Sequence, residues 1–430
     1  MYGGLLKSAS ALAIVAAASL FGISSAKAAD LGGDCCADLE ERVAELEATT
    51  ARKGTRKVSL TISGQVSQEL LYWDDGIRDD LYVTGPNASN SRWRFLGSAK
   101  ISPDVTAGFL YEVQVYASAS SGVNQTNGGD DGGATAGTTL REAMVWIESA
   151  RLGRVSIGHG STAANNAILV DLSGKGMAAS NGVFLHPAAF RIAQANGAYS
   201  NATWGNFFQG NGDWLNTRNE HIQYRTPTFA GFSFGASFGE DNYWDVEGRY
   251  SGEFNGVRIA GRLGYSVLSE FNGAAGALTC TTNCEKAIEQ LAGSLSVRHM
   301  PTGLFFTGAA GHRETSGSDT PFAVASFDSS FYYLSAGVAR NFTGLGDTVF
   351  YGEYSEWKGM AQDIFVDGTS SDKLKHWGVG IVQHVDAAAM EFWLAYKSYS
   401  LDGGCLICGV DPALAAEDFS VITAGTRIRF

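Results

Sequence analysis

The chain has 430 residues, a formal net charge of −13 at pH 7 and 54 glycines against only 7 prolines. The acidic balance provides no basic stripe for nucleic acid, so we expect no nucleic-acid partner. The scarcity of proline suits a chain whose backbone N–H groups almost all enter strand ladders. The 24 Phe, 16 Tyr and 9 Trp would suit aromatic girdles at two membrane interfaces.

The first 28 residues have the pattern of a secretory signal peptide. Lys7 supplies a positive n-region, 11–23 is apolar, and Ala26-Lys27-Ala28 is an A-x-A cleavage site. The apolar run is too short for a membrane-spanning helix, which needs about 20 residues. Because the removed segment carries two lysines and no acid, cleavage would move the net charge to about −15.

Residues 29–56 form a leader in which the hydrophobic period becomes helical. A 3-4-3-4 spacing joins Cys36, Leu39, Val43, Leu46 and Thr50. This seam predicts a short coiled-coil helix at the periplasmic rim, although two heptads are too few to be stable alone. An oligomeric coil and a single amphipathic helix lying on the rim both remain open.

From Lys57 onward the pattern alternates with period 2, as strands of a half-buried sheet do. In the first segment Val58, Leu60 and Ile62 share one face, while Ser59 and Thr61 share the other. Such segments recur sixteen times, near 58–73, 92–101, 105–115, 140–149, 153–159, 219–227, 230–239, 243–251, 255–268, 286–299, 303–311, 329–341, 347–356, 374–385, 387–400 and 418–430.

The connections between these segments alternate between short turns and long polar loops. Short examples are 227–231 and 300–303, and long ones are 269–285 and 401–417. An even number of strands with short turns at one end is typical of outer-membrane barrels. We therefore predict an all-β transmembrane barrel over 57–430, with 16 antiparallel strands, a polar lumen and a location in the lipid of the cell outer membrane. The last strand ends on Phe430, as the strands that such barrels present for assembly do.

One connection is far longer than the others. The segment 160–218 separates the fifth and sixth strands, and a loop of this length in a compact protein is usually functional. It carries many apolar residues, including Ile168, Phe190 and Phe207, so we do not expect it to project into water.

The six cysteines fall into three close pairs. In an oxidising compartment Cys280/Cys284 and Cys405/Cys408 are predicted to form small loop disulfides. Cys405 and Cys408 also have C-x-x-C spacing, but no second pair at zinc spacing accompanies them. The vicinal Cys35 and Cys36 could be free or could join subunits.

Several segments resemble the general porins of alphaproteobacteria, as in rhizobial species and brucellae. They are 38–64, Tyr72-Trp-Asp-Asp-Gly76, Arg92-Trp-Arg-Phe-Leu-Gly-Ser-Ala-Lys100 and the terminal Arg-Phe430. The resemblance implies a homotrimer of sixteen-stranded barrels whose third external loop, here 160–218, folds inward and narrows the lumen. It implies passive diffusion of small hydrophilic solutes and ions.

A pore selects by its radius and by the charges that line it. We expect basic residues of one wall to face acids of the loop and to create a transverse field. By alternation, or by position on the long loop, the pore-lining and constriction candidates are Arg92, Arg94, Lys100, Glu112, Asp171, Lys175, Arg191, Arg258, Arg262 and Arg298.

Enzymatic and cofactor chemistry find no support in the sequence. The seven histidines are scattered without zinc-ligand spacing, and nucleotide-binding motifs are absent. We therefore expect no cofactor and no enzyme. Two alternatives to a general pore remain. One is a sugar-specific channel with Trp204, Phe207 and Trp214 as an aromatic track, and the other is a mainly structural barrel tethered through 35–56.

Overall fold

A computed structural model describes residues 57–129, 137–180, 186–208, 214–215, 218–240, 242–268, 285–318, 325–360, 371–404, 410 and 415–430. The predicted signal peptide and the helix expected within 29–56 lie outside these residues. No helix among the described residues is long and apolar enough to cross a membrane.

The cysteine predictions also fall outside the described residues. Cys280 and Cys284 precede the first described residue of the strand that begins at Glu285, and Cys405 and Cys408 follow the described strand that ends at Gly404. The disulfides Cys280–Cys284 and Cys405–Cys408 therefore stay predictions, as does the state of Cys35 and Cys36.

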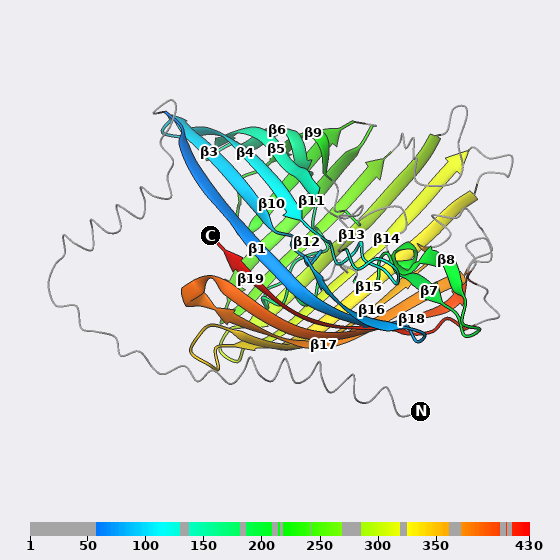
Figure 1. The fold of residues 1–430 in the computed structure, drawn as a ribbon. Helices are drawn as coiled ribbons and strands as arrows, with labels where there is room; N and C mark the ends of the chain where they lie inside the picture. Colours follow the sequence, from blue (N-terminus) through cyan, green and yellow to red (C-terminus); the bar gives the residue numbers. More distant parts are fainter. Residues whose placement is uncertain are drawn as a thin grey trace. The chain divides into compact units, whose positions relative to one another are not determined.

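The described chain is almost entirely β-structure (Figure 1). The barrel strands are β1 (Ser59–Asp74), β2 (Asp79–Thr84), β3 (Arg92–Ser102), β4 (Val105–Tyr116), β5 (Gly137–Ser149), β6 (Gly153–Ser161), β9 (Arg218–Arg225), β10 (Phe232–Gly239), β11 (Trp244–Phe254), β12 (Val257–Leu268), β13 (Glu285–His299), β14 (Leu304–Ser318), β15 (Ala325–Arg340), β16 (Thr348–Lys358), β17 (Ser371–Val385), β18 (Met390–Gly404) and β19 (Phe419–Arg429). The small hairpin β7 (Arg191–Ala193) and β8 (Tyr199–Thr203) and the 3₁₀ turn η1 (Trp204–Phe207) lie outside this sheet, and a second 3₁₀ turn, η2 (Asp386–Ala388), joins β17 to β18.

The sheet closes because its first and last strands pair. β1 and β19 are antiparallel neighbours from Gln65 opposite Arg429 to Asp74 opposite Ser420. Gly64 and Phe430 extend the seam, each donating its N–H to the other's carbonyl oxygen, at 2.9 and 3.1 Å. Because β2 and β3 pair with successive parts of β1 and act as one strand, the closed barrel has sixteen strands, as the sequence predicts.

The short strand β2 was not predicted, because no strand was expected between 73 and 92. Residues 85–91 leave the sheet, and the inward side chain of Gln65 donates hydrogen bonds to the carbonyl oxygens of Ser89 and Asn90 at 3.1 and 2.8 Å. Pro86 has no N–H to donate, so it cannot continue a strand ladder after Gly85. β14 and β15 are also longer than expected, since their pairing continues to Gly317 opposite Ala325.

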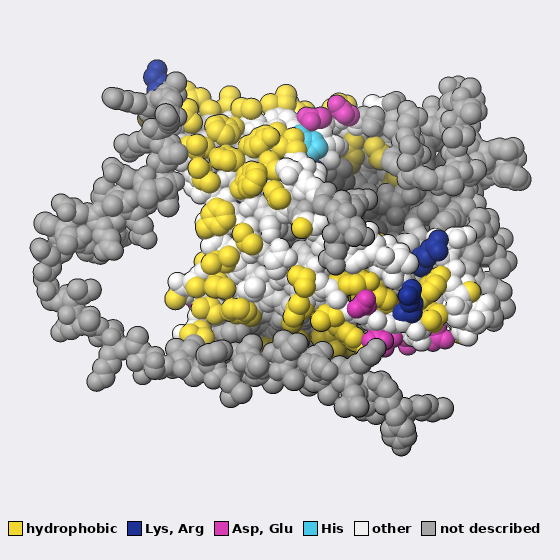
Figure 2. Space-filling view, viewed as in Figure 1, with side chains coloured by type: hydrophobic (Ala, Val, Ile, Leu, Met, Phe, Trp, Pro, Cys, Tyr) yellow, Lys and Arg dark blue, Asp and Glu magenta, His cyan; other side chains and the backbone are white. Residues whose placement is uncertain are grey.

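The outer face of the barrel is apolar. Val66, Phe234 and Leu263 are exposed, whereas their inward neighbours Ser67 and Gly235 face the interior. Figure 2 shows hydrophobic side chains spread over this face, with the few charged ones gathered at its edges. Aromatic pairs occupy two levels of the barrel, Phe232–Tyr250 and Phe342–Phe350 near the turns, and Trp244–Tyr265 and Trp377–Tyr396 towards the loops. These two bands match the aromatic girdles of membrane barrels.

Short turns connect the strands at one end. β11 and β12 are joined by Asn255 and Gly256 alone, with φ of +50° and +75°. Positive φ at both positions defines the turn whose twist matches paired strands, and Asn-Gly tolerates it best. We call this end the turn end and the opposite end the loop end.

Gly64 leaves space for the terminal aromatic ring. A Cβ atom there would lie 2.6 Å from Cζ of Phe430 and 2.5 Å from the carbonyl oxygen of Arg92. We expect Gly64→Val to displace Phe430 and to lower the free energy of unfolding by about 1–3 kcal/mol. Urea unfolding of the refolded protein, followed by tryptophan fluorescence, measures this change.

Gly137→Val is the matched control, because a Cβ at Gly137 has no atom within 4 Å. Equal urea midpoints for the two variants would contradict the packing of Phe430 at the seam.

Candidate functional site in the barrel interior

The connection between β6 and β9, residues 162–217, is the third loop at the loop end. Its first part crosses the inner face of the wall. Ala163 N–H donates to Ser237 Oγ on β10 at 2.7 Å, and Ala164 N–H donates to Asp245 Oδ2 on β11 at 2.9 Å. A Cβ at Gly235 would lie 3.1 Å from Cβ of Ala163, so the loop backbone runs directly over β10.

Further along, serine hydroxyls of β13 hold the loop. Val170 and Leu172 donate their N–H groups to Ser294 Oγ and Ser296 Oγ, each at 3.0 Å. Ser294 Oγ donates in turn to the carbonyl oxygen of Ala167 at 2.6 Å. These inward hydroxyls are hydrogen-bonded to loop backbone groups and so attach the loop to the wall.

Two of the predicted arginines also hold this backbone. Arg262 donates to the carbonyl oxygens of Asn165 and Asn166 at 2.7 and 3.1 Å. Arg298 donates to the carbonyl oxygen of Leu172 at 3.3 Å. Both lie on the inner face, as alternation predicts, but part of their hydrogen-bonding capacity is used to position the loop.

Asp171 and Lys175 form an ion pair within the loop, with 3.0 Å between Oδ1 and Nζ. Lys175 is fully buried, and its ammonium lies 5.9 Å from the ring centres of both Phe305 and Tyr333. Burial opposes ionisation of Asp171, but the Lys175 ammonium and hydrogen bonds from Ser173 prevail and lower the pKa of this carboxyl. The expectation that loop acids oppose the wall arginines is therefore wrong for Asp171, whose charge is neutralised four residues away.

The second half of the loop packs through aromatic side chains. Trp204, Phe207 and Trp214 are 1%, 0% and 2% exposed. Trp214 meets Phe331 of β15 at a ring-centre distance of 4.9 Å, and the cluster continues over the inner faces of β1 and β13–β19. Burying a large apolar side chain contributes about 1.5–3 kcal/mol, so this cluster holds the loop to one side of the interior. The rings have no free face for a sugar, which argues against the aromatic track.

The opposite side of the interior carries a cluster of arginines. Glu112 of β4 accepts hydrogen bonds from Arg92 at 3.2 Å, from Arg141 at 2.7 Å and from Arg94. Arg218 lies 3.9 Å from Glu142. Three cations therefore surround one buried carboxylate. Alternation places Arg92, Arg94 and Glu112 on the inner face, but their ion pairs were not predicted.

Sequence reasoning missed Arg141. Strict alternation turns it away from the lumen, because its neighbour Glu142 points inward. The β4–β5 register shifts between Glu112 and Val113, and this bulge brings Arg141 to the same face as Glu142. No sequence signal marked the bulge.

A second arginine group lies on β9, β11 and β12. Glu247 forms ion pairs with both Arg249 and Arg262 and is buried. Arg249 also donates to the carbonyl oxygen of Ala163 at 3.3 Å. Arg225, two strands away, is not among the sequence candidates although it sits on the inner face of β9.

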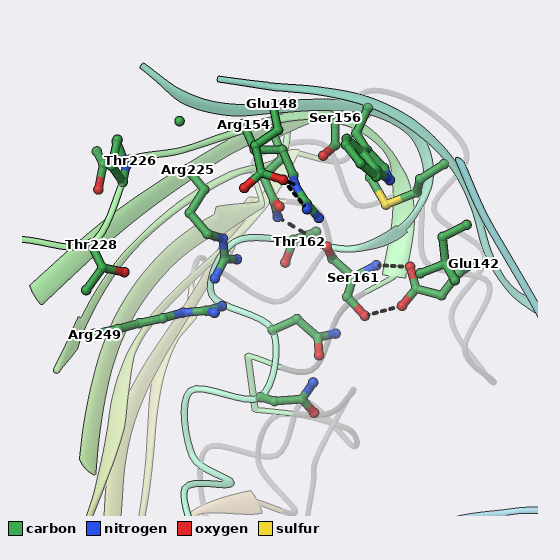
Figure 3. A pocket seen from close by; sticks show the side chains of 18 of the residues that line it. Glu142, Glu148, Arg154, Ser156, Ser161, Thr162, Arg225, Thr226, Thr228 and Arg249 are labelled. Carbon is green, nitrogen blue, oxygen red and sulfur yellow. Dashed lines mark hydrogen bonds and ion pairs between the residues drawn. The ribbon is translucent and has the colours of Figure 1, made fainter. Parts of the chain in front are cut away.

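Between these groups lies a cavity of about 810 Å³ at the turn end of the interior. Its lining includes Arg154, Arg225, Arg249, Glu142 and Glu148. In Figure 3, Arg225 and Arg249 reach into it from one side, while Ser161 is bonded to Glu142 on the other. The cavity lies beneath the start of the third loop, since Thr162, Asn165 and Asn166 form part of its lining.

The remaining candidates lie elsewhere. Lys100 is exposed near the β3–β4 turn, and Arg258 pairs with Glu253 at 3.1 Å close to the β11–β12 turn. Both lie near the turn end. Among the residues that the structure describes, neither forms a hydrogen bond with the third loop. Arg191 lies on β7 with an exposed side chain, and its N–H donates to Gln125 at 3.1 Å. In the part of the chain that the structure describes, no group of His, Cys, Asp and Glu could hold a metal ion.

Replacing Ser294 and Ser296 by alanine tests the attachment of the loop to the wall. Their loss removes the wall acceptors of the part-buried N–H groups of Val170 and Leu172, hydrogen bonds that contribute about 0.5–1.5 kcal/mol each. We expect the S294A/S296A variant to show stronger fluctuations of current through single barrels in planar bilayers.

Ser335→Ala is the control, because this buried wall serine donates to the carbonyl oxygen of Gly352 across the sheet rather than to the loop. If S294A/S296A records as quietly as wild type and S335A, the serine contacts do not hold the loop.

The chain matches the Gram-negative porin family over residues 10–403. No curated protein sequence matches it. Among solved structures, an anion-selective porin from Comamonas acidovorans is 19% identical, with a TM-score of 0.54, covering 87% of this chain and 100% of that one. OmpT of Vibrio cholerae in its trimer form is 12% identical (TM-score 0.52, 87% and 99% covered), and OmpF of Salmonella typhi in complex with daunomycin is 15% identical (0.52, 88% and 99%). At these identities the structures share the fold.

Proposed function

Because this chain belongs to the Gram-negative porin family, we propose that its outer-membrane channel passes small hydrophilic solutes and ions by passive diffusion and favours anions. The closed barrel, with an apolar outer face and a polar cavity within, supports passage through the interior.

The excess of arginine on one inner wall carries the anion preference. From β3 to β12 the inner wall has six carboxylates, Glu112, Glu142, Glu148, Asp245, Glu247 and Glu253, against nine guanidinium groups, Arg92, Arg94, Arg141, Arg154, Arg218, Arg225, Arg249, Arg258 and Arg262. Anion-selective pores are lined by arginine and lysine side chains arranged around the path. The net charge of −13 does not oppose this assignment, because charges more than about 10 Å from the path are largely screened at 0.1 M salt.

The third loop would narrow the lumen and set its size limit. Its aromatic half fills the side of β1 and β13–β19, and the arginine wall remains opposite. This arrangement supports the inward-folded loop that the family resemblance implies. The anion-selective porin of Comamonas acidovorans shares the fold and is consistent with the same preference.

We further propose that the chain is of the alphaproteobacterial type and assembles as a homotrimer. The first proposal is supported by the entry segment 38–64 and by Arg92–Lys100. The second is supported by the helical seam within 35–56 and by the fold shared with a trimeric OmpT. Current steps that appear in groups of three on insertion would agree with it.

The loop disulfides Cys280–Cys284 and Cys405–Cys408 are part of the same proposal. They are supported by the close spacing of each pair in the sequence and by the oxidising compartment in which an outer-membrane barrel presents its loops. Each would close only a small ring, so neither bond would constrain the barrel strands on either side of it.

The salt-gradient reversal potential tests the function. In a planar bilayer with a KCl gradient, the refolded protein should give a potential of the sign for chloride permeation. Arg92→Gln, Arg94→Gln and Arg141→Gln together should move this potential towards zero, because they leave Glu112 without its cations.

Arg151→Gln is the control, since Arg151 lies in the β5–β6 turn with an 81% exposed side chain. A potential of the potassium sign, or a triple variant that behaves like Arg151→Gln, would contradict the anion preference. A correctly folded barrel without conductance would contradict passage itself.

A further inference from the structure

The turn-end cavity has an unusual arrangement of like charges. Arg154 of β6 is the direct cross-strand partner of Arg225 on β9, and Arg249 of β11 is the direct partner of Arg262 on β12. Directly opposed side chains of an antiparallel pair have Cβ atoms about 4.5–5.5 Å apart, and like charges there are destabilising. Two such pairs, separated only by β10, need counter-charges.

The protein supplies direct ion pairs to three of these four arginines, while Glu247 and Asp245 attract the fourth, Arg225, only from a distance. Glu148 pairs with Arg154 at 2.5 Å, and Glu247 pairs with both Arg249 and Arg262. The side chain of Arg225 forms no hydrogen bond and no ion pair with any residue that the structure describes. Its guanidinium group therefore keeps all of its donors for another partner.

The strand between the two arginine pairs leaves room for that partner. β10 presents Gly235 opposite Arg225 and Ser233 opposite Arg249, so no large side chain separates the two guanidinium groups. In Figure 3 the ends of Arg225 and Arg249 point towards each other and into the cavity. Thr226, Thr228 and Ser156 add hydroxyl groups to the same lining.

We propose that this cavity is a binding site for the phosphate group of a small solute, held between Arg225 and Arg249. The planar guanidinium fork of Arg225 matches phosphate oxygens bidentately, and Arg249, which already bonds Glu247 and Ala163, adds its remaining donors and its charge. A volume of about 810 Å³ is within the range of small-ligand sites, so the rest of a phosphorylated solute fits beside its anionic group. This inference rests on the proposed anion passage. It adds that a phosphorylated solute binds in the cavity for a time before it moves on.

The site is tested with inorganic phosphate as the probe. A group bound in the path slows the ions behind it, so phosphate added to a KCl bath should reduce the single-channel chloride current and the reduction should saturate. The half-blocking concentration should rise about tenfold in Arg225→Gln, because a charge-assisted bidentate contact is lost. Arg225→Lys, which retains the charge without the fork, should fall between the two.

Arg258→Gln is the matched control. Arg258 is an inward arginine near the turn end that is already paired with Glu253, and it does not line the cavity. Its half-blocking concentration should equal that of wild type.

The outcomes separate this inference from the proposed function. A chloride-selective wild-type channel whose current shows no saturable phosphate block would overturn the site and leave the anion preference intact. Saturable block that is unchanged in Arg225→Gln would also overturn it. If both Arg225 variants fail to fold, two measurements on the wild-type protein replace them: saturable block of the channel, and phosphate binding to the detergent-solubilised protein by calorimetry. Both results together support the site, and the lack of both overturns it.

Discussion

Every backbone polar group within a membrane must find its partner inside the protein, and this constraint determines the fold of the chain. Strands meet it only if the sheet closes, since an open edge would leave a row of unpaired groups in lipid. The pairing of β1 with β19, extended by Gly64 and Phe430, removes that edge. Closure gives each strand one face in lipid and one towards the interior, so alternate residues are apolar and polar. The strand residues that line the interior are therefore every second residue of each strand.

The third loop divides this interior into two unlike sides. Its aromatic half is buried against β1 and β13–β19, where Trp214, Phe331 and Trp357 pack closely. Its first part is held over β10–β13 by hydroxyls and arginines that bond its backbone. The third loop is thus held by hydrophobic packing along its aromatic half and by hydrogen bonds along its first part. The arginines that remain near the cavity give this part of the lumen a local charge opposite to that of the whole chain.

The sequence predicted the features that depend on alternation. All sixteen strands and the inward position of Arg92, Arg94 and Glu112 follow from the period of two. It did not reveal features that depend on where alternation breaks. Arg141 faces inward because of a bulge, and β2 is separated from β3 by residues that bond to Gln65, Ser118 and Ser120. The pairing of Asp171 with Lys175 depends on how the loop folds, which periodicity does not encode.

The central claim is that the third loop lies on the inner wall over β10, and cross-linking tests it most directly. In a background in which the six native cysteines are serine, Ala163→Cys and Gly235→Cys should form a disulfide on mild oxidation, because a Cβ at Gly235 lies close to that of Ala163. The cross-linked barrel should still conduct, since the bond joins groups already in contact. Two free thiols, each labelled by a maleimide with no cross-link after oxidation, would contradict the account.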